Sequence, residues 1–144
     1  MKIVVGVDES PHARAALKWI RGMTWPAGTR VIVVSAVRPM VMAYAEVYAP
    51  ATASLQQADE DQLHFQQELT ARAEQELRAG GLRTEARVLH GDPREVLVDT
   101  ARAEGAQLLV VGSHGRSGLA KLLLGSVASH VVTHAPCNVM VVKI

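Results

Sequence analysis

The feature that most constrains the fold is a set of short, β-branched apolar runs that alternate with segments of helical periodicity. Ile3 to Val7, Val31 to Val37 and Leu108 to Val111 are apolar at almost every position. They lack the polar alternation of a half-exposed strand and are typical of strands covered on both faces, as in parallel sheets. Two further runs, Thr84 to Leu89 and Val139 to Val142, complete a set of five predicted strands.

Helical segments separate the predicted strands. The first follows Ser10 and Pro11, which suit the N-cap and the first helical position. Three more helices are predicted over about Leu55 to Ala79, Arg94 to Ala103 and Leu119 to His134. Strands that alternate with helices pair in parallel through right-handed crossovers. We therefore predict one α/β domain over residues 1–144, with a doubly wound five-stranded parallel sheet and helices on both faces.

Composition narrows the classes of protein. The 144 residues are 49% hydrophobic with a formal net charge of +1, which excludes a disordered chain and gives no basic footprint for nucleic acid. The single cysteine, Cys137, favours a reducing compartment and is expected to be an inert buried thiol. No signal peptide or transmembrane run is found, so we expect a cytoplasmic protein without a membrane partner. The aperiodic segment from Pro39 to Ser54 is expected to be a long loop.

The most informative residues follow the fourth predicted strand. Gly112 and Gly115 lie in a turn that leads to a helix, and Gly125 and Ser126 come later in the same segment. Glycines permit positive φ angles and remove the Cβ atoms that would keep a ligand from the backbone amides. Amides at the amino end of a helix form an anion site, to which the cation Arg116 and the hydroxyls of Ser113, Ser117 and Ser126 can add donors. The pattern predicts a phosphate-binding turn.

Several of these residues also have a purely structural interpretation. Gly112 can simply make a tight strand–helix turn, and Asp8, which follows the first strand, can simply cap the first helix. Inside a helix, Gly125 would cost about 1 kcal/mol relative to alanine. Either the helix starts there or another group approaches its backbone.

Two common nucleotide sites are excluded by spacing. No glycine precedes a lysine, as a P-loop requires, and the turn reads Gly-x-x-Gly-x-x-Gly instead of the dinucleotide pattern Gly-x-Gly-x-x-Gly.

The spacing Gly112-x-x-Gly115, followed after nine residues by Gly125-Ser126, resembles the nucleotide-binding signature of the universal stress protein family, in its ATP-binding branch. The resemblance extends from Val4-Val5-Gly6-Val7-Asp8 through His90-Gly91-Asp92-Pro93 to Ala135-Pro136-Cys137-Asn138-Val139. It implies strand order 3-2-1-4-5, bound ATP with Mg²⁺ held by the phosphates, and a homodimer through the C-terminal strand. It also implies a nucleotide-dependent regulator of the stress response.

The resemblance implies a role for each site residue. Asp8 would lie near the ribose, beside the backbone of Gly6 and Val7, and Ala36 would present its backbone to the adenine. The ribose and phosphates would lie against the glycine turn and the following helix. The expected nucleotide-binding residues are Gly6, Val7, Asp8, Ala36, Val111, Gly112, Gly115, Arg116, Gly125, Ser126, Val127 and Ala128.

Dimerisation also has support from the residues themselves. Val139 to Val142 is apolar at every position, and an apolar strand at a sheet edge needs cover because its open edge invites pairing. A symmetric dimer would provide that cover.

Weaker signals are interpreted conservatively. His114 lies within the glycine turn and would border the ligand without a catalytic role. His130 and His134 are expected to form a surface pair instead of a metal site, since no third ligand is evident.

Enzymatic turnover is not expected, because the sequence shows no P-loop lysine and no evident base for an attacking water, although slow hydrolysis stays open. Two alternatives remain: an interaction module that works without a bound nucleotide, and a domain of similar topology that uses a flavin or an adenylate.

Overall fold

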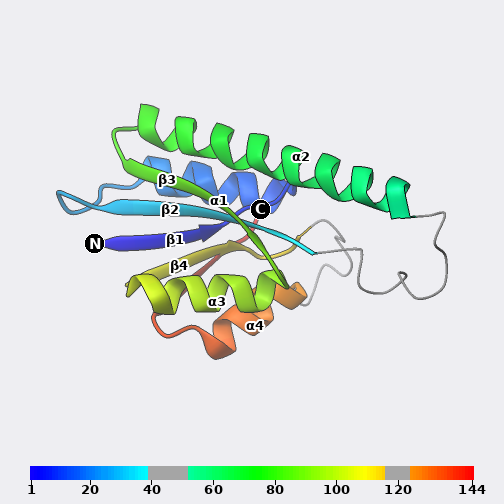
Figure 1. Ribbon diagram of the computed structural model, residues 1–144. Coiled ribbons are helices and arrows are strands. Elements are labelled where there is room, and N and C mark those ends of the chain that lie inside the picture. Colours follow the sequence, from blue (N-terminus) through cyan, green and yellow to red (C-terminus); the bar gives the residue numbers. More distant parts are fainter. Residues whose placement is uncertain (39–51, 116–123) are drawn as a thin grey trace.

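Each β-branched run of the sequence forms a strand of one sheet. The computed structural model describes residues 1–38, 52–115 and 124–144. Its strands are β1 (Lys2–Gly6), β2 (Arg30–Val37), β3 (Arg83–His90), β4 (Leu108–Gly112) and β5 (Asn138–Val142). They lie in the order β3-β2-β1-β4-β5, and every neighbouring pair is parallel (Figure 1). The predicted sheet and its strand order are confirmed.

Two layers of helices cover the sheet. In the described residues the helices are α1 (Pro11–Gly22), α2 (Thr52–Ala79), α3 (Pro93–Glu104) and α4 (Ser126–His134). Figure 1 shows α1 and α2 on one face of the sheet and α3 and α4 on the other.

Two predicted helix boundaries differ from the structure. The second helix begins at Thr52 instead of about Leu55, so residues 52–54 belong to α2 and not to the expected loop, whose residues 39–51 lie outside the described part of the chain. The last helix begins at Ser126 instead of Leu119. Residues 124 and 125 are not helical, and residues 119–123 are not described.

Side chains of the strands alternate between two cores, which explains why the strand runs are apolar throughout. Ile3 and Val5 of β1 are fully buried on the side of α1 and α2, together with Leu77. Val4, between them in sequence, is fully buried on the opposite side against Leu97 of α3. Burying one such aliphatic side chain contributes about 1.5–3 kcal/mol relative to its exposure. The sheet therefore depends on both helical layers.

The crossover connections change direction beside β1. Helices α1 and α2 carry the chain from β1 outward to β3, whereas α3 crosses the opposite face to reach β4 on the other side of β1. The loops after β1 and β4 therefore start at the carboxyl ends of neighbouring strands and lead to opposite faces of the sheet. In doubly wound sheets, ligands bind at the carboxyl ends of such strands.

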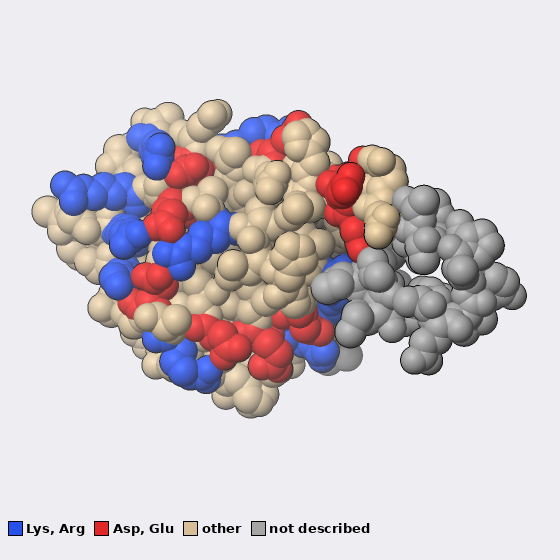
Figure 2. All heavy atoms as spheres, in the orientation of Figure 1, with Lys and Arg blue, Asp and Glu red and all other residues tan. Residues whose placement is uncertain are grey.

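Charged side chains of both signs interleave on the face that Figure 2 shows, near the end of the molecule where the chain begins. Glu85 of the edge strand β3 pairs with Arg87 and Arg30, and Arg87 also contacts Glu104, which pairs with Lys2 at 3.5 Å. Hydrogen bonds from Arg87 and then Arg30 lower the pKa of the Glu85 carboxyl. Charges of opposite sign thus form a connected network that joins β3 to β2, to the end of α3 and to β1.

No helix in the described part of the chain has the length and apolar character needed to cross a membrane.

The start of α3 provides a test of how a capping carboxylate contributes to stability. Asp92 accepts a hydrogen bond from the Arg94 amide at 2.9 Å, and its carboxylate also contacts the guanidinium groups of Arg94 and Arg38. The side-chain hydrogen bond from Arg94, then its amide and the charge of Arg38, hold the pKa of Asp92 well below its usual value. A lowered pKa in the folded state stabilises the protein above the unfolded-state value of about 4.

Replacing this carboxylate should therefore have a pH-dependent effect. We expect Asp92→Asn, which keeps a capping oxygen, to cost about 0.5 kcal/mol at pH 7, and Asp92→Ala about 1 kcal/mol. The gap between the unaltered protein and Asp92→Asn should narrow progressively as the pH falls below about 4, because the unfolded chain then binds a proton at Asp92 that the folded protein still lacks. Urea unfolding between pH 7 and pH 2 measures the free energy of unfolding of the unaltered protein and of both variants. A difference between the unaltered protein and Asp92→Asn that stays constant with pH would contradict the electrostatic explanation.

Candidate functional site

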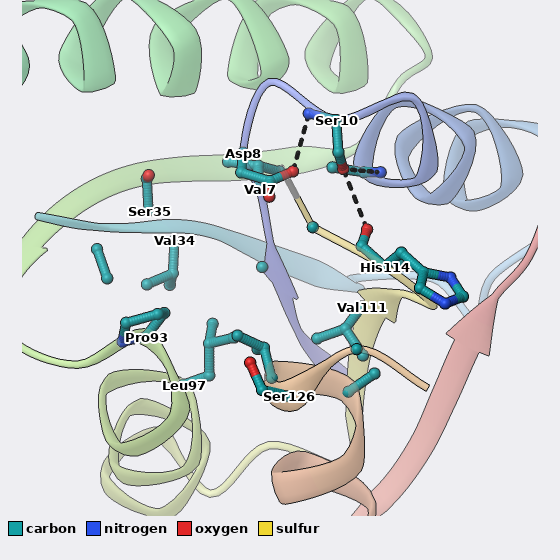
Figure 3. Close-up of a pocket in the computed structure, with 18 of the residues that line it drawn as sticks. Val7, Asp8, Ser10, Val34, Ser35, Pro93, Leu97, Val111, His114 and Ser126 are labelled. Carbon is teal, nitrogen blue, oxygen red and sulfur yellow. Dashed lines mark hydrogen bonds between the residues drawn. The ribbon is translucent and has the colours of Figure 1, made fainter. Parts of the chain in front are cut away.

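A cavity of about 310 Å³ lies at the carboxyl ends of β1, β2 and β4, where the crossovers change direction. Its volume falls within the range of about 300–1,000 Å³ that is usual for small-molecule sites. Figure 3 shows Asp8 and Ser35 on one side of this space and Pro93, Leu97 and Ser126 on the other.

Most of the residues expected at the site line this one cavity. Arg116 lies outside the described residues. The other eleven are Gly6, Val7, Asp8, Ala36, Val111, Gly112, Gly115, Gly125, Ser126, Val127 and Ala128. Three different strand ends and one helix start therefore converge on a single space.

The wall with the clearest anion-binding character is the start of α4. Gly125 is the N-cap residue, and no side chain caps the helix. The Ser129 amide makes the first bond within the helix, to the Gly125 carbonyl at 2.9 Å, so the amides of Ser126, Val127 and Ala128 come before it. Such amides carry the positive end of the helix dipole, about +0.5 charge. This wall can bind an anion through the backbone alone.

The site glycines provide space instead of unusual backbone angles. Positive φ angles among the described glycines occur elsewhere, so Gly112, Gly115 and Gly125 do not use the conformational freedom that glycine permits. A Cβ on Gly125 would lie 3.2 Å from the Ser113 carbonyl oxygen, and one on Gly115 would lie 3.0 Å from Oδ2 of Asp8. Both alternatives for Gly125 therefore hold: the helix starts directly after it, and another backbone segment approaches it.

Asp8 supports the first helix without capping it. Its Oδ1 accepts the Ser10 amide at 3.0 Å, and Oγ of Ser10 accepts the Ala13 amide at 3.1 Å, so Ser10 is the N-cap of α1. The Ser10 hydroxyl also donates to the His114 carbonyl at 3.3 Å, which joins α1 to the glycine turn (Figure 3). Asp8 lines the cavity, and its Oδ2 faces Gly115. A carboxylate in this position can accept hydrogen bonds from sugar hydroxyls.

The backbone of Ala36 faces the cavity at the other end. The ladder between β1 and β2 ends where the Val7 amide donates to the Val34 carbonyl at 2.9 Å. Successive strand residues direct their N–H and C=O groups to alternate sides, so Ala36 points the same way as Val34, beyond the end of β1. Within the described residues these two groups have no backbone partner on that side. They form an adjacent donor and acceptor on the cavity wall.

Eight lining residues were not expected from the sequence, and most come from elements that pack over the strand ends. They are Ser10, Ala13, Val34, Ser35, Arg38, Gln66, Pro93 and Leu97. One signal was available: Ser35 is a polar residue in an otherwise apolar strand run. Its hydroxyl donates to Oε1 of Gln66 on α2 at 2.5 Å. Gln66 lies in a Gln- and Glu-rich helix, where no pattern marks it.

Ser113 holds two histidines behind the glycine turn. Its Oγ is 3.0 Å from Nδ1 of His12 and 3.1 Å from Nδ1 of His114, and Ser113 is only 1% exposed. One hydroxyl can donate to one of these nitrogens and accept from the other. The expectation that the Ser113 hydroxyl contributes to the anion site is therefore wrong, because it is directed to the two rings and does not line the cavity.

Gly112 has a packing role as well as a place on the cavity wall. A Cβ there would lie 2.7 Å from Cβ of His12 and 2.8 Å from its carbonyl carbon. The structural alternative for this glycine is thus supported by direct packing of α1 on the end of β4.

The remaining polar candidates lie away from the cavity. His130 and His134 stack with ring centroids 4.1 Å apart, and Nε2 of His130 is 3.3 Å from the Glu95 carboxylate. Within the described part of the chain, no three potential metal-ligating side chains come together. Cys137 is half-buried, not fully buried as expected, and burial raises the pKa of its thiol.

Comparisons with known proteins agree with this architecture. The model of the universal stress protein family matches residues 1–143, and the chain belongs to that family. A universal stress protein of Thermus aquaticus, from the 3′ region of a QAH/OAS sulfhydrylase gene, is 30% identical over 141 residues. The match covers 98% of this chain and 97% of the relative.

Solved structures give the same fold. Protein MJ0577 of Methanocaldococcus jannaschii is similar with a TM-score of 0.83 and 25% identity, covering 99% of this chain and 95% of that one. The universal stress protein of Archaeoglobus fulgidus in complex with dAMP is similar with a TM-score of 0.66 and 25% identity, covering 99% and 98%.

The packing of Gly112 leads to a stability prediction. We expect Gly112→Ala to destabilise the protein by about 1–3 kcal/mol, because the added methyl group meets the backbone of α1, which cannot move freely. Gly22→Ala is the matched control, since a Cβ at Gly22 meets no other atom within 4 Å. Urea unfolding measures both variants, and equal stability of the two would contradict the packing role.

Proposed function

We propose that this protein binds ATP in the cavity and acts as a cytoplasmic, nucleotide-dependent regulator in the stress response. The observation that carries the proposal is that backbone groups without a backbone partner line the cavity at two separate places. The N–H and C=O of Ala36 lie at one end, and the first amides of α4 lie at the other. The former suit a nucleobase and the latter suit phosphates. The related protein whose structure contains dAMP supports an adenine nucleotide.

The base end of the cavity matches adenine. Along its Watson–Crick edge, adenine presents a ring-nitrogen acceptor, N1, beside an amino donor, N6. The N–H and C=O of Ala36 offer the complementary donor and acceptor. Guanine presents the opposite arrangement, a protonated N1 beside a carbonyl oxygen. The apolar side chains of Val34, Pro93 and Leu97 provide surfaces for the faces of a flat ring.

The other end of the cavity matches a ribose and phosphates. The Asp8 carboxylate accepts from the ribose hydroxyls, and the amides of Ser126, Val127 and Ala128 donate to phosphate oxygens. Gly115 permits close approach because it adds no side chain beside Asp8. We propose that Mg²⁺ accompanies ATP and is held by the phosphates, as is usual where few protein carboxylates are present.

We further propose that the protein binds ATP without efficient turnover. Hydrolysis of the γ-phosphate needs a group that positions the attacking water. Among the described residues that line the cavity, the carboxylate is Asp8, which is hydrogen-bonded to the Ser10 amide, and the imidazole is His114, whose Nδ1 faces Ser113. Both groups are engaged in holding the turns that shape the cavity.

Calorimetry with ATP, AMP and FMN tests the nucleotide proposal. We expect the unaltered protein to bind ATP selectively and Gly115→Val to lose measurable binding while it remains folded. A valine there fills the space beside Asp8, and the atom it meets is the movable end of a side chain. Gly22→Val, at a glycine with open space around it, is the control and should bind ATP normally.

Each other outcome of this titration contradicts the proposal in a different way. Preferential binding of FMN would favour a flavin-using domain of similar topology. No binding of any of the three compounds would favour an interaction module. Normal binding by Gly115→Val would remove the glycine turn from the site.

We also propose that the protein forms a homodimer through β5. This strand is an edge of the sheet, and its apolar residues from Val139 to Val142 are only half-buried. The Val142 carbonyl accepts from the Ser113 amide, so by alternation the N–H and C=O of Val141 point outward. An open apolar edge of this kind favours pairing with a second strand.

Light scattering coupled to size-exclusion chromatography tests the dimer. We expect a dimer at micromolar concentration and a monomer for Val141→Pro, which removes an outward N–H while the bonds to β4 remain. Val132→Ser removes an exposed apolar side chain of α4 and is the control that should stay dimeric. A monomeric unaltered protein, or a dimeric Val141→Pro variant, would contradict pairing through β5.

A further inference from the structure

One polar side chain in the cavity wall is buried with half of its hydrogen-bonding capacity unused. Gln66 of α2 is 2% exposed, and Ser35 of β2 beside it is 3% exposed. The Ser35 hydroxyl donates to Oε1 of Gln66, so the carbonyl side of the carboxamide is engaged and its orientation is set. The two N–H groups on Nε2 have no partner in the described part of the chain.

The unpaired donor is open to the cavity. Among the described residues, no side-chain nitrogen or oxygen atom that is itself buried lacks a hydrogen-bond partner, so Nε2 of Gln66 keeps access to the cavity although the residue as a whole is buried. Gln66 lines the cavity, so the open donor borders the space that we assign to the nucleotide. A ligand that brings an acceptor to this wall satisfies the donor.

The location of Gln66 indicates which part of the ligand it meets. Ser35, its partner, directly precedes Ala36, whose N–H and C=O face the base end of the cavity. The Gln66 carboxamide lies on the α2 side of this end, because Ser35 and α2 share that face of the sheet. Pro93 and Leu97 of α3 line the opposite side (Figure 3). One wall of the base end is therefore apolar and the other carries a neutral donor.

We propose that Gln66 is a base-binding residue whose Nε2 donates a hydrogen bond to a ring nitrogen of adenine. This inference rests on the proposed binding of ATP. Ala36 engages the Watson–Crick edge, which leaves N7 and N3 as the unprotonated ring nitrogens available to another donor. Ser35 is a positioning residue, since its hydroxyl holds Oε1 and thereby presents Nε2 to the ligand. Base recognition then combines backbone groups from β2 with one side chain from α2.

Calorimetry with ATP, 7-deaza-ATP and 3-deaza-ATP tests this assignment. We expect the unaltered protein to bind ATP about tenfold more tightly than the analogue that lacks the accepting nitrogen. Gln66→Met, which has similar size but no donor, should bind ATP about tenfold more weakly than the unaltered protein does. This variant should bind that analogue with the same affinity as ATP, because the hydrogen bond is already absent. A purely structural role of Gln66 would not produce this dependence on a single ring atom.

Two more variants separate the donor from its surroundings. Gln66→Glu keeps an acceptor for the Ser35 hydroxyl but has no N–H, so it should also bind ATP at least about tenfold more weakly. Gln67→Met changes the neighbouring exposed residue of α2 and should match the unaltered protein with all three nucleotides. Thermal unfolding of each variant checks that the fold is retained.

The outcomes distinguish this inference from the proposed function. If ATP binds with an affinity independent of Gln66, or if Gln66→Met weakens all three nucleotides equally, base recognition by Gln66 is wrong and ATP binding stands. Equal affinity of the unaltered protein for all three nucleotides is also against it. If the unaltered protein binds none of them, both the proposed function and this inference fail.

Discussion

The burial of β1, β2 and β4 on both faces is the constraint on which the rest of the structure depends. Two helical layers can cover a parallel sheet only if the crossovers change sides, and here they do so between β1 and β4. β1 turns toward α1 at Asp8, whereas β2 continues to Val37 alongside β3. The backbone of Ala36 is then left without a partner toward β1. The open groups at the site are therefore a consequence of the winding of the sheet.

The proposed site is built mainly from backbone groups, so the binding of a highly charged ligand that we propose is compatible with a net charge of only +1. The amides at the start of α4 contribute partial positive charge without any lysine or arginine. Gly125 allows this helix start to lie against the Ser113 carbonyl, and Gly115 leaves room beside Asp8. Recognition by backbone amides requires that the ligand come close to the backbone. The proposed site therefore depends more on its glycines, which leave this space, than on its ionisable side chains.

The sequence predicts the strands and helices well because two-sided burial leaves a clear signal, such as Val31 to Val34 in β2. Strand order came from family resemblance, since apolar runs do not specify their neighbours. The start of α4 was placed too early, because apolar residues before Gly125 continue the helical pattern while the backbone turns there to meet Ser113. Gln66 was missed because only the packing of α2 over Ser35 brings it to the cavity.

The two kinds of site residue are under different physical constraints. Ala36 and the start of α4 are positioned by the sheet itself, so any sequence that keeps these crossovers keeps their N–H and C=O groups in place. Gln66 instead depends on the rotation of α2 about its own axis, which is set by Leu77 and Ala73 packing on the opposite end of the same face. A shift of one residue along that helix would bring Phe65 or Gln67 to this position in place of Gln66. In the proposed nucleotide site, the backbone groups are thus positioned by the winding of the sheet, whereas the proposed contact from Gln66 depends on how one helix side chain packs.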